Sequence, residues 1–327
     1  MRIFFYVAVL AVMVVNGLTD APNAIATCVA SRSLSPTRAI FMAGIMNFLG
    51  AVTMSIISPR VAETVYKMVE LPIEPKRRIL VLSAGMCAVV LWSLLAFLFG
   101  IPTSESHALV SGLTGAAIAA SMSFSVVNPY EWGLIFIGLG ASSLPTFFIS
   151  KYAYRICLEL SSGVDRRRAI GHFSRAQRIS AAWSAFMHGA QDSQKFLGVL
   201  MLGSCLGAHQ GDFNIPPYLV LISASAMTFG TLIGGKRIIK KVGSAMTRLD
   251  AAGGTCADIS SSLAMSVSSL IGLPVSTTHA KTSAMMGVGS EMGRFDRSVA
   301  REIVLAWLIT FPVCTLIGFL LGLFFLR

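Results

Sequence analysis

The chain has 327 residues, of which 54% are hydrophobic and only 13% charged, and its mean hydropathy is +0.73. Charged residues make up about 25% of an ordinary soluble domain, so the composition excludes that class and predicts an integral membrane protein embedded in a lipid bilayer. The formal net charge of +11 does not indicate nucleic-acid binding, because the basic residues gather in short stretches between apolar segments, as in cytoplasmic loops.

The apolar runs are long enough for membrane helices rather than barrel strands, so we predict an all-α polytopic fold. Taken in chain order, the expected segments of the first half are residues 3–18, 38–57, 79–100, 107–127 and 132–154. Those of the second half are residues 178–202, 213–234, 255–272, 279–290 and 303–326.

Two motifs occur twice, at the same shift. Residues Gly100–Gly115 read GIPTSESHALVSGLTG and residues Gly272–Gly287 read GLPVSTTHAKTSAMMG, with seven of 16 positions identical. NGLTDAPN at Asn16–Asn23 likewise matches HGAQDSQK at His188–Lys195, and the shift is 172 positions for both motifs. Two unrelated chance matches would not share a spacing, so we infer an internal duplication.

Each copy has five segments, and an odd number of crossings places the second copy in the membrane upside down. We therefore predict an inverted repeat, with a first copy at 1–154, a basic cytoplasmic linker at 155–177 and a second copy at 178–327. The parity holds if every segment crosses. The breaks at Pro102 and Pro274 also allow re-entrant hairpins, in which two half-helices meet at the membrane midplane.

Loop charge predicts the orientation. Seventeen Lys and Arg residues lie in the loops 31–38, 150–180, 234–250 and 290–301, whereas the other side has seven. Basic residues favour the cytoplasmic side, so we expect both termini outside and the central linker inside, in a plasma or inner membrane.

Hydroxyl and polar residues follow each proline break, where a helix is expected to begin. In the first copy these residues are Thr103, Ser104, Glu105 and Ser106, and in the second they are Ser276, Thr277 and Thr278. Such residues cap helix N-termini, whose free amides attract anions. A single copy would indicate only a cap, but a duplicated one within membrane segments predicts a substrate site.

Asp20 and Asp192 lie within or at the end of apolar segments, where a charged side chain costs about 3 kcal/mol or more and indicates function. With Thr19, Asn23 and Gln191 nearby, they offer the oxygen atoms that hold Na⁺ beside broken helices. The structural alternative is a pair of buried carboxylates that cap helices or bind a lysine.

Four further polar residues are expected to support these sites. His107 and His279 have no second His or Cys at ligand spacing, which argues against zinc. We expect each to bond the opposite half-helix backbone, with a proton relay as the lesser alternative. Lys195 could pair with Asp192, and Lys281 follows the second histidine.

These motifs resemble those of the inorganic phosphate transporter (PiT) family. NGLTDAPNA is similar to the family signature GANDVANA, GAQDSQKFLG to its second bacterial copy, and GIPTSESHAL and GLPVSTTHA to its paired Pro/Ser/Thr/His motifs. The resemblance covers nearly the whole chain. It implies secondary transport of a tetrahedral oxyanion, with Na⁺ or H⁺ as the driving ion and no other cofactor, in a homodimer.

The resemblance also implies roles for individual residues. Asp20, Asn23 and Asp192 match coupling-ion ligands, and the matched substrate contacts are Ser104, Ser106, Ser276, Thr277 and Thr278. Phosphate is the expected substrate, and sulfate, carried by similar permeases, is the alternative. An intramembrane Ser/His/Asp enzyme is a weaker interpretation because an active site needs one asymmetric nucleophile and base; a passive channel is a third.

Glu105 and Lys281 depart from the family pattern. Inversion symmetry could bring them together as an ion pair. Hydrogen phosphate can donate a proton to a free carboxylate, whereas sulfate cannot. We therefore expect phosphate if Glu105 faces the anion, whereas sulfate stays open if Lys281 binds Glu105.

Overall fold

The computed structural model describes the whole chain except residues 72–73, 100–102, 205–214, 246–248 and 296. The described part is helical apart from turns and one isolated β-bridge, and the predicted all-α fold is confirmed. The first half contains α1 (Arg2–Thr19), α2 (Ala21–Ala30), α3 (Pro36–Ile57), α4 (Arg60–Lys67), α5 (Pro75–Phe99), α6 (Glu105–Ser121), η1 (Phe124–Val126) and α7 (Pro129–Ser161). The second contains α8 (Arg166–Ser204), α9 (Pro217–Ala245), α10 (Ala251–Ile271), α11 (Thr277–Glu291) and α12 (Arg297–Leu326).

Each of the ten predicted segments coincides with a helix of the described chain, and three short elements were not predicted: α2, α4 and η1. The separation of α1 from α2 has a local cause. Pro22 stands in the first turn of α2, where its missing N–H and fixed φ are tolerated, whereas inside a continuous helix it would remove a hydrogen bond. The predicted linker at 155–177 consists of the ends of α7 and α8 and the turn at 162–165.

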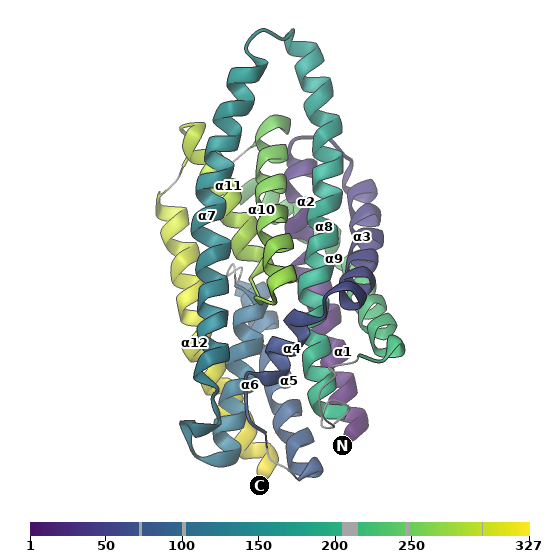
Figure 1. Ribbon diagram of the computed structural model, residues 1–327, viewed down its shortest axis with the longest axis vertical. Helices are drawn as coiled ribbons and strands as arrows, with labels where there is room; N and C mark the ends of the chain where they lie inside the picture. Colours follow the sequence, from purple (N-terminus) through teal and green to yellow (C-terminus); the bar gives the residue numbers. More distant parts are fainter. Residues whose placement is uncertain (72–73, 100–102, 205–214, 246–248, 296) are drawn as a thin grey trace.

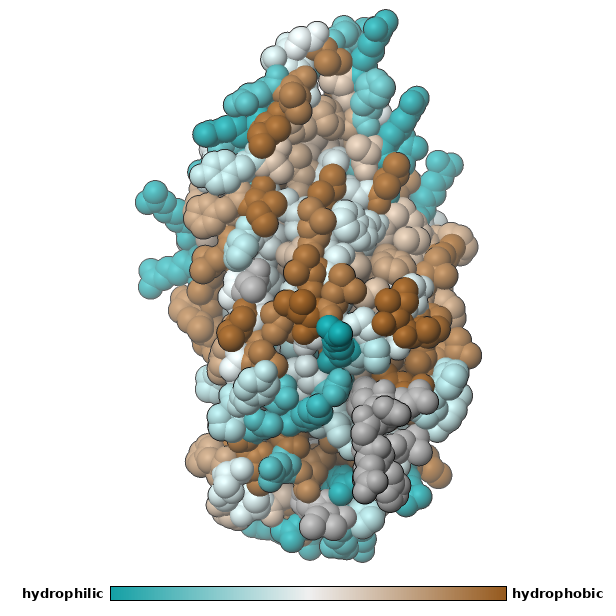
Figure 2. Space-filling model, in the orientation of Figure 1, coloured by the Kyte–Doolittle hydropathy of each residue, from teal (hydrophilic) through white to brown (hydrophobic). Residues whose placement is uncertain are grey.

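Six stretches of the described chain are long and apolar enough to cross a membrane: Arg2–Ala30, Pro36–Ile57, Pro75–Phe99, Pro129–Ser161, Pro217–Gly234 and Ala300–Leu326. The chain is therefore a multi-pass membrane protein. α8 and α10 are absent from this set because buried polar side chains lower their hydropathy, Asp192 in α8 and Asp258 in α10 among them. Figure 2 shows one face of the molecule, with hydrophobic side chains across the middle and hydrophilic ones at the upper end.

Two helix pairs form hairpins that enter from opposite ends of the molecule. Figure 1 shows α5 and α6 in the lower part and α10 and α11 in the upper part. α10 ends at Gly272, whose φ of 82° suits glycine, and an extended stretch leads into α11. The structure thus forms a helical hairpin around Pro274, as the re-entrant alternative expects, and re-entry into the membrane stays a prediction. Pro102 itself lies outside the described residues.

The helix packing has the reciprocity expected of an inverted repeat. α1 packs on α9 and α3 packs on α8, while α6 packs on α12 and α11 packs on α7. In Figure 1, α7 ends at the top and α12 ends at the bottom, so the last helices of the two halves run in opposite directions. Both termini consequently lie at the lower end.

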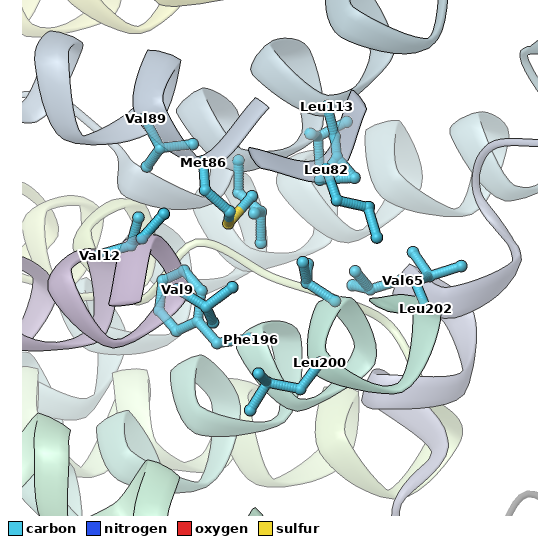
Figure 3. Close-up of a cluster of buried hydrophobic side chains, with 14 of the residues drawn as sticks. Val9, Val12, Val65, Leu82, Met86, Val89, Leu113, Phe196, Leu200 and Leu202 are labelled. Atoms are coloured by element: carbon cyan, nitrogen blue, oxygen red, sulfur yellow. The ribbon is translucent and has the colours of Figure 1, made fainter. Parts of the chain in front are cut away.

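The surroundings of the two hairpins, α5–α6 and α10–α11, differ in polarity. Figure 3 shows the apolar cluster around α5 and α6, to which α1, α4 and α8 also contribute side chains. Met86 and Leu109 belong to this cluster. The residues 172 positions later are Asp258 and Lys281, which form a buried ion pair between α10 and α11.

Candidate functional site between two half-helix ends

α6 and α11 begin in the centre of the molecule, and both beginnings are buried. Ser104 caps α6 by accepting a hydrogen bond from the amide of His107 (3.4 Å), and Ser276 caps α11 in the same way through His279 (3.2 Å). The two capping hydroxyl oxygens are 2.8 Å apart, so the two helix ends meet as the sequence predicts. The positive dipole ends of two helices converge here, which suits an anion.

Hydroxyls of the second motif link this centre to the two predicted carboxylates. Thr278 donates a hydrogen bond to Asp20, and Thr277 donates one to Asp192 at 3.3 Å. The structure thus brings the hydroxyl motifs and the aspartates, which lie far apart in the sequence, into one buried cluster.

Thr103 lies at the edge of this cluster. Its hydroxyl accepts a hydrogen bond from the indole of Trp92 (2.8 Å) and contacts the hydroxyl of Thr310 (2.9 Å). These bonds join α5, α6 and α12 near the hairpin tip. Thr103 therefore fixes the start of α6, although its place in the motif groups it with the predicted substrate-binding residues.

Glu105 is buried at the start of α6 and does not form the hypothesised pair with Lys281. One of its carboxylate oxygens accepts a hydrogen bond from Thr19, and the other has no hydrogen-bond partner in the described structure. Lys281 instead forms the ion pair with Asp258, one turn or more along α10 and α11 from the hairpin tip. Among the described residues, the carboxylate of Glu105 is thus free of any ammonium.

Asp20 lies at the interruption between α1 and α2. In addition to Thr278, its carboxylate accepts a hydrogen bond from the amide of Asn23 at 2.8 Å. The side chain is buried. A buried carboxylate at a broken helix with neutral oxygen-bearing neighbours is the kind of site that binds Na⁺ or a proton.

Asp192 lies inside the continuous helix α8 and has more partners. Lys195 contacts it at 2.6 Å, Asn16 donates a hydrogen bond at 3.0 Å, and Nε2 of His188 lies 3.4 Å away. The structural alternative weighed for Asp192, pairing with Lys195, is therefore present in the structure. The environments of the two aspartates differ although their sequence motifs match.

Gln191 and the two histidines bond elsewhere than expected. The amide nitrogen of Gln191 donates to Ser269 of α10 at 2.8 Å, and its Oε1 is buried without a hydrogen-bond partner among the described residues. Nδ1 of His107 pairs with the backbone carbonyl of Trp307 in α12 (3.4 Å) rather than with the backbone of the opposite half-helix, while its ring packs edge to face on the ring of His279 in α11, with the centroids 4.4 Å apart. His279 stacks on the Trp307 ring with the centroids 3.4 Å apart, so the histidines pack the hairpin tips against α12.

Three residues near the site were not predicted from the sequence. Asn16 and His188 begin the duplicated motif and are equivalent by the shift of 172, which is the signal that could have found them. Side-chain atoms of Asp20, His188 and Asp192 lie within 4.8 Å of one another, a spacing that could hold a cation. The third residue, Asp258, has the signal used for Asp20, an acid in an apolar segment.

Two buried helix N-termini that meet beside carboxylates, within a multi-pass helical fold, are the arrangement of a membrane transport protein. Comparison with known families agrees. The model of the Phosphate transporter family matches residues 16–162 and 159–318, and the chain belongs to this family.

Individual relatives cover nearly the whole chain. A Bacillus subtilis protein named "Probable low-affinity inorganic phosphate transporter" is 32% identical over 97% of this chain and 95% of its own length. A Rhizobium meliloti protein of the same name is 33% identical over 93% and 90%, respectively. A solved structure described as "The sodium-dependent phosphate transporter" has the same fold, with a TM-score of 0.81, 22% identity and 98% coverage of both chains.

Proposed function

We propose that this protein carries inorganic phosphate across a membrane by secondary active transport, with the anion bound between the N-termini of α6 and α11. The observation that carries the proposal is the contact of Ser104 with Ser276, which brings two buried helix N-termini to one point. Family membership and the names of the relatives support the choice of phosphate.

Glu105 favours phosphate over sulfate in this proposal. Its second carboxylate oxygen is buried beside the paired helix ends and has no hydrogen-bond partner among the described residues. Lys281, the lysine expected to neutralise it, is bound to Asp258. A hydrogen phosphate ion can donate its proton to this oxygen, whereas sulfate would place a negative charge beside it. Sulfate transport on the same fold is the second candidate function.

The driving ion of the proposed carrier is Na⁺ or H⁺, bound at Asp20. The support is the buried carboxylate, the neighbouring Asn23 and the interruption between α1 and α2. The structural neighbour is named as sodium-dependent, which favours Na⁺. Gln191, through its unpartnered Oε1, and Thr19, which also bonds Glu105, complete the proposed ion-binding set. Asp192 contributes negative charge close to it.

The cellular arrangement is part of the same proposal. We place both termini outside and the turn between α7 and α8 in the cytoplasm, supported by the distribution of basic residues. The division into copies at 1–154 and 178–327 is supported by the reciprocal helix packing. The expected location is a plasma or inner membrane. Dimer formation rests on the family resemblance.

The test is uptake of radiolabelled phosphate into proteoliposomes, with Na⁺ and proton gradients imposed separately and sulfate as a competitor. We expect gradient-driven accumulation that resists sulfate and is lost in Asp20→Asn. The control Glu63→Gln removes an exposed carboxylate outside the site and should transport normally. Phosphate uptake without accumulation indicates a channel, and uptake abolished by sulfate indicates a sulfate permease.

A further inference from the structure

The two copies place different residues at one equivalent position, three residues after the aspartate. The first copy has Asn23 and the second has Lys195. The Lys195 side chain is only 2% exposed, and its ammonium contacts Asp192 Oδ1 at 2.6 Å, Ser106 Oγ at 2.7 Å and the carbonyl oxygen of Val275 at 2.6 Å. All three donors of the ammonium thus meet oxygen atoms.

The oxygens around Lys195 correspond to residues around Asp20. By the shift of 172, Asp192 corresponds to Asp20 and Ser106 to Thr278. Thr278 is bonded to Asp20, as Ser106 is bonded to the ammonium beside Asp192. The two copies therefore build the same type of pocket from a carboxylate and a hydroxyl of the opposite hairpin.

The chemistry of these pockets differs in one respect. A carboxylate, a hydroxyl and a backbone carbonyl are the neutral and charged oxygens that bind Na⁺ beside half-helix ends. At Asp192 these three oxygens surround a lysine ammonium, a compact positive charge. A second cation placed among them would face this ammonium without an uncommitted oxygen of Asp192, since Asn16 and Thr277 bond the other one.

We propose that the ammonium of Lys195 occupies the place of a cation in the second copy, so that only the position at Asp20 exchanges its cation with solution. The proposal rests on the proposed function, in which Asp20 binds the driving ion. Of the two equivalent positive charges, the one at Asp192 is then the lysine of the chain itself. The protein carries one cation fewer per cycle than two identical sites would carry.

Counting bound ²²Na⁺ on the purified full-length protein, by scintillation proximity without phosphate, tests this directly. The variant Lys195→Asn copies the first motif and should bind one more Na⁺ per chain than the unmodified protein. Lys195→Arg keeps the positive charge and is the matched control, with no gain expected. The reciprocal variant Asn23→Lys should lose Na⁺ binding at Asp20.

A gain of one Na⁺ in Lys195→Asn that is absent in Lys195→Arg supports the proposal. No gain in a variant that elutes as the unmodified protein does on size exclusion overturns it. Two Na⁺ bound per unmodified chain also overturns it, and this measurement requires no variant. Failure of the proposed function is distinguishable, because it appears as absent phosphate uptake in proteoliposomes whatever the Na⁺ count.

Discussion

The buried pair Lys281–Asp258 joins the two helices of the second hairpin. Removal of one partner of a buried ion pair leaves an uncompensated charge and costs about 3–5 kcal/mol, whereas an apolar pair of similar volume can be neutral. The first copy has such a pair at the equivalent positions, Met86 and Leu109, both buried. An apolar replacement is therefore available within the chain itself.

We predict that Lys281→Leu lowers the free energy of unfolding by about 3 kcal/mol, and that the double variant Asp258→Met/Lys281→Leu recovers most of this loss. Thermal unfolding in detergent measures both. The recovery stays incomplete because Thr27 and Ser180 lose their hydrogen bonds to Asp258. A double variant as unstable as the single one contradicts the prediction.

Glu105 offers a second test at the residue scale. Glu105→Gln removes the negative charge beside the proposed anion site, so sulfate should compete about tenfold better for phosphate uptake. The measurement is the sulfate concentration that halves uptake in proteoliposomes. Glu291→Gln, which changes a carboxylate paired with Arg155 away from the site, is the control and should leave that concentration unchanged.

At the scale of helices, glycine sets how closely α8 approaches α3. A Cβ on Gly189 would lie 2.1 Å from the carbonyl oxygen of Asn47, and one on Gly17, the equivalent residue of α1, would lie 2.1 Å from that of Met227 in α9. No real side chain tolerates such a distance, so the shared glycine of the duplicated motif is a packing residue. It holds each aspartate-bearing helix against its neighbour.

Gly189→Ala should therefore destabilise the protein by about 1–3 kcal/mol, the typical effect of overpacking. Gly171→Ala, in the same helix, is the control, since a Cβ there meets nothing within 4 Å. That control should be neutral or slightly stabilising because alanine favours the helix. Equal melting temperatures for the two variants would refute the assignment.

Local patterns predicted the helices well because each apolar run is a property of adjacent residues. The division at Asp20 could have been read from Pro22, but the choice between crossing and re-entry at Pro274 depends on where two distant hairpins pack. The ion pair of Lys281 was likewise beyond prediction. The symmetry of the repeat suggested Glu105 as the partner of Lys281, whereas the packing of α10 on α11 places Asp258 beside Lys281.

The whole molecule has an apolar half near the termini and a polar half at the opposite end. The α5–α6 hairpin sits in the apolar cluster of Figure 3, whereas Asp258 of the α10–α11 hairpin is bonded by Thr27 of α2 and Ser180 of α8. Water can therefore enter the more polar second interface more easily. We predict faster hydrogen–deuterium exchange in α10 and α11 than in α5 and α6, measured by mass spectrometry in detergent. Equal protection of the two hairpins contradicts this.

Orientation can be tested at the same scale. The first turn of α8 exposes Arg166, Arg167 and Arg168 at the end opposite to the termini. If this end faces the cytoplasm, trypsin should cleave the chain at these arginines in inside-out vesicles but not when it is added to intact cells. Cleavage from the outer face of intact cells would reverse the assigned orientation.

The direct contact between the hydroxyls of Ser104 and Ser276 has a mechanical consequence. In the proposed site, an anion bound by both helix ends replaces this 2.8 Å contact with two hydrogen bonds of its own, each about 2.7 Å long, so the tips separate to admit it. Binding of the anion would then move apart the tips of α5–α6 and α10–α11, the two hairpins that enter from opposite ends. In the proposed carrier, separation of the two hairpin tips is thus coupled to binding of the anion.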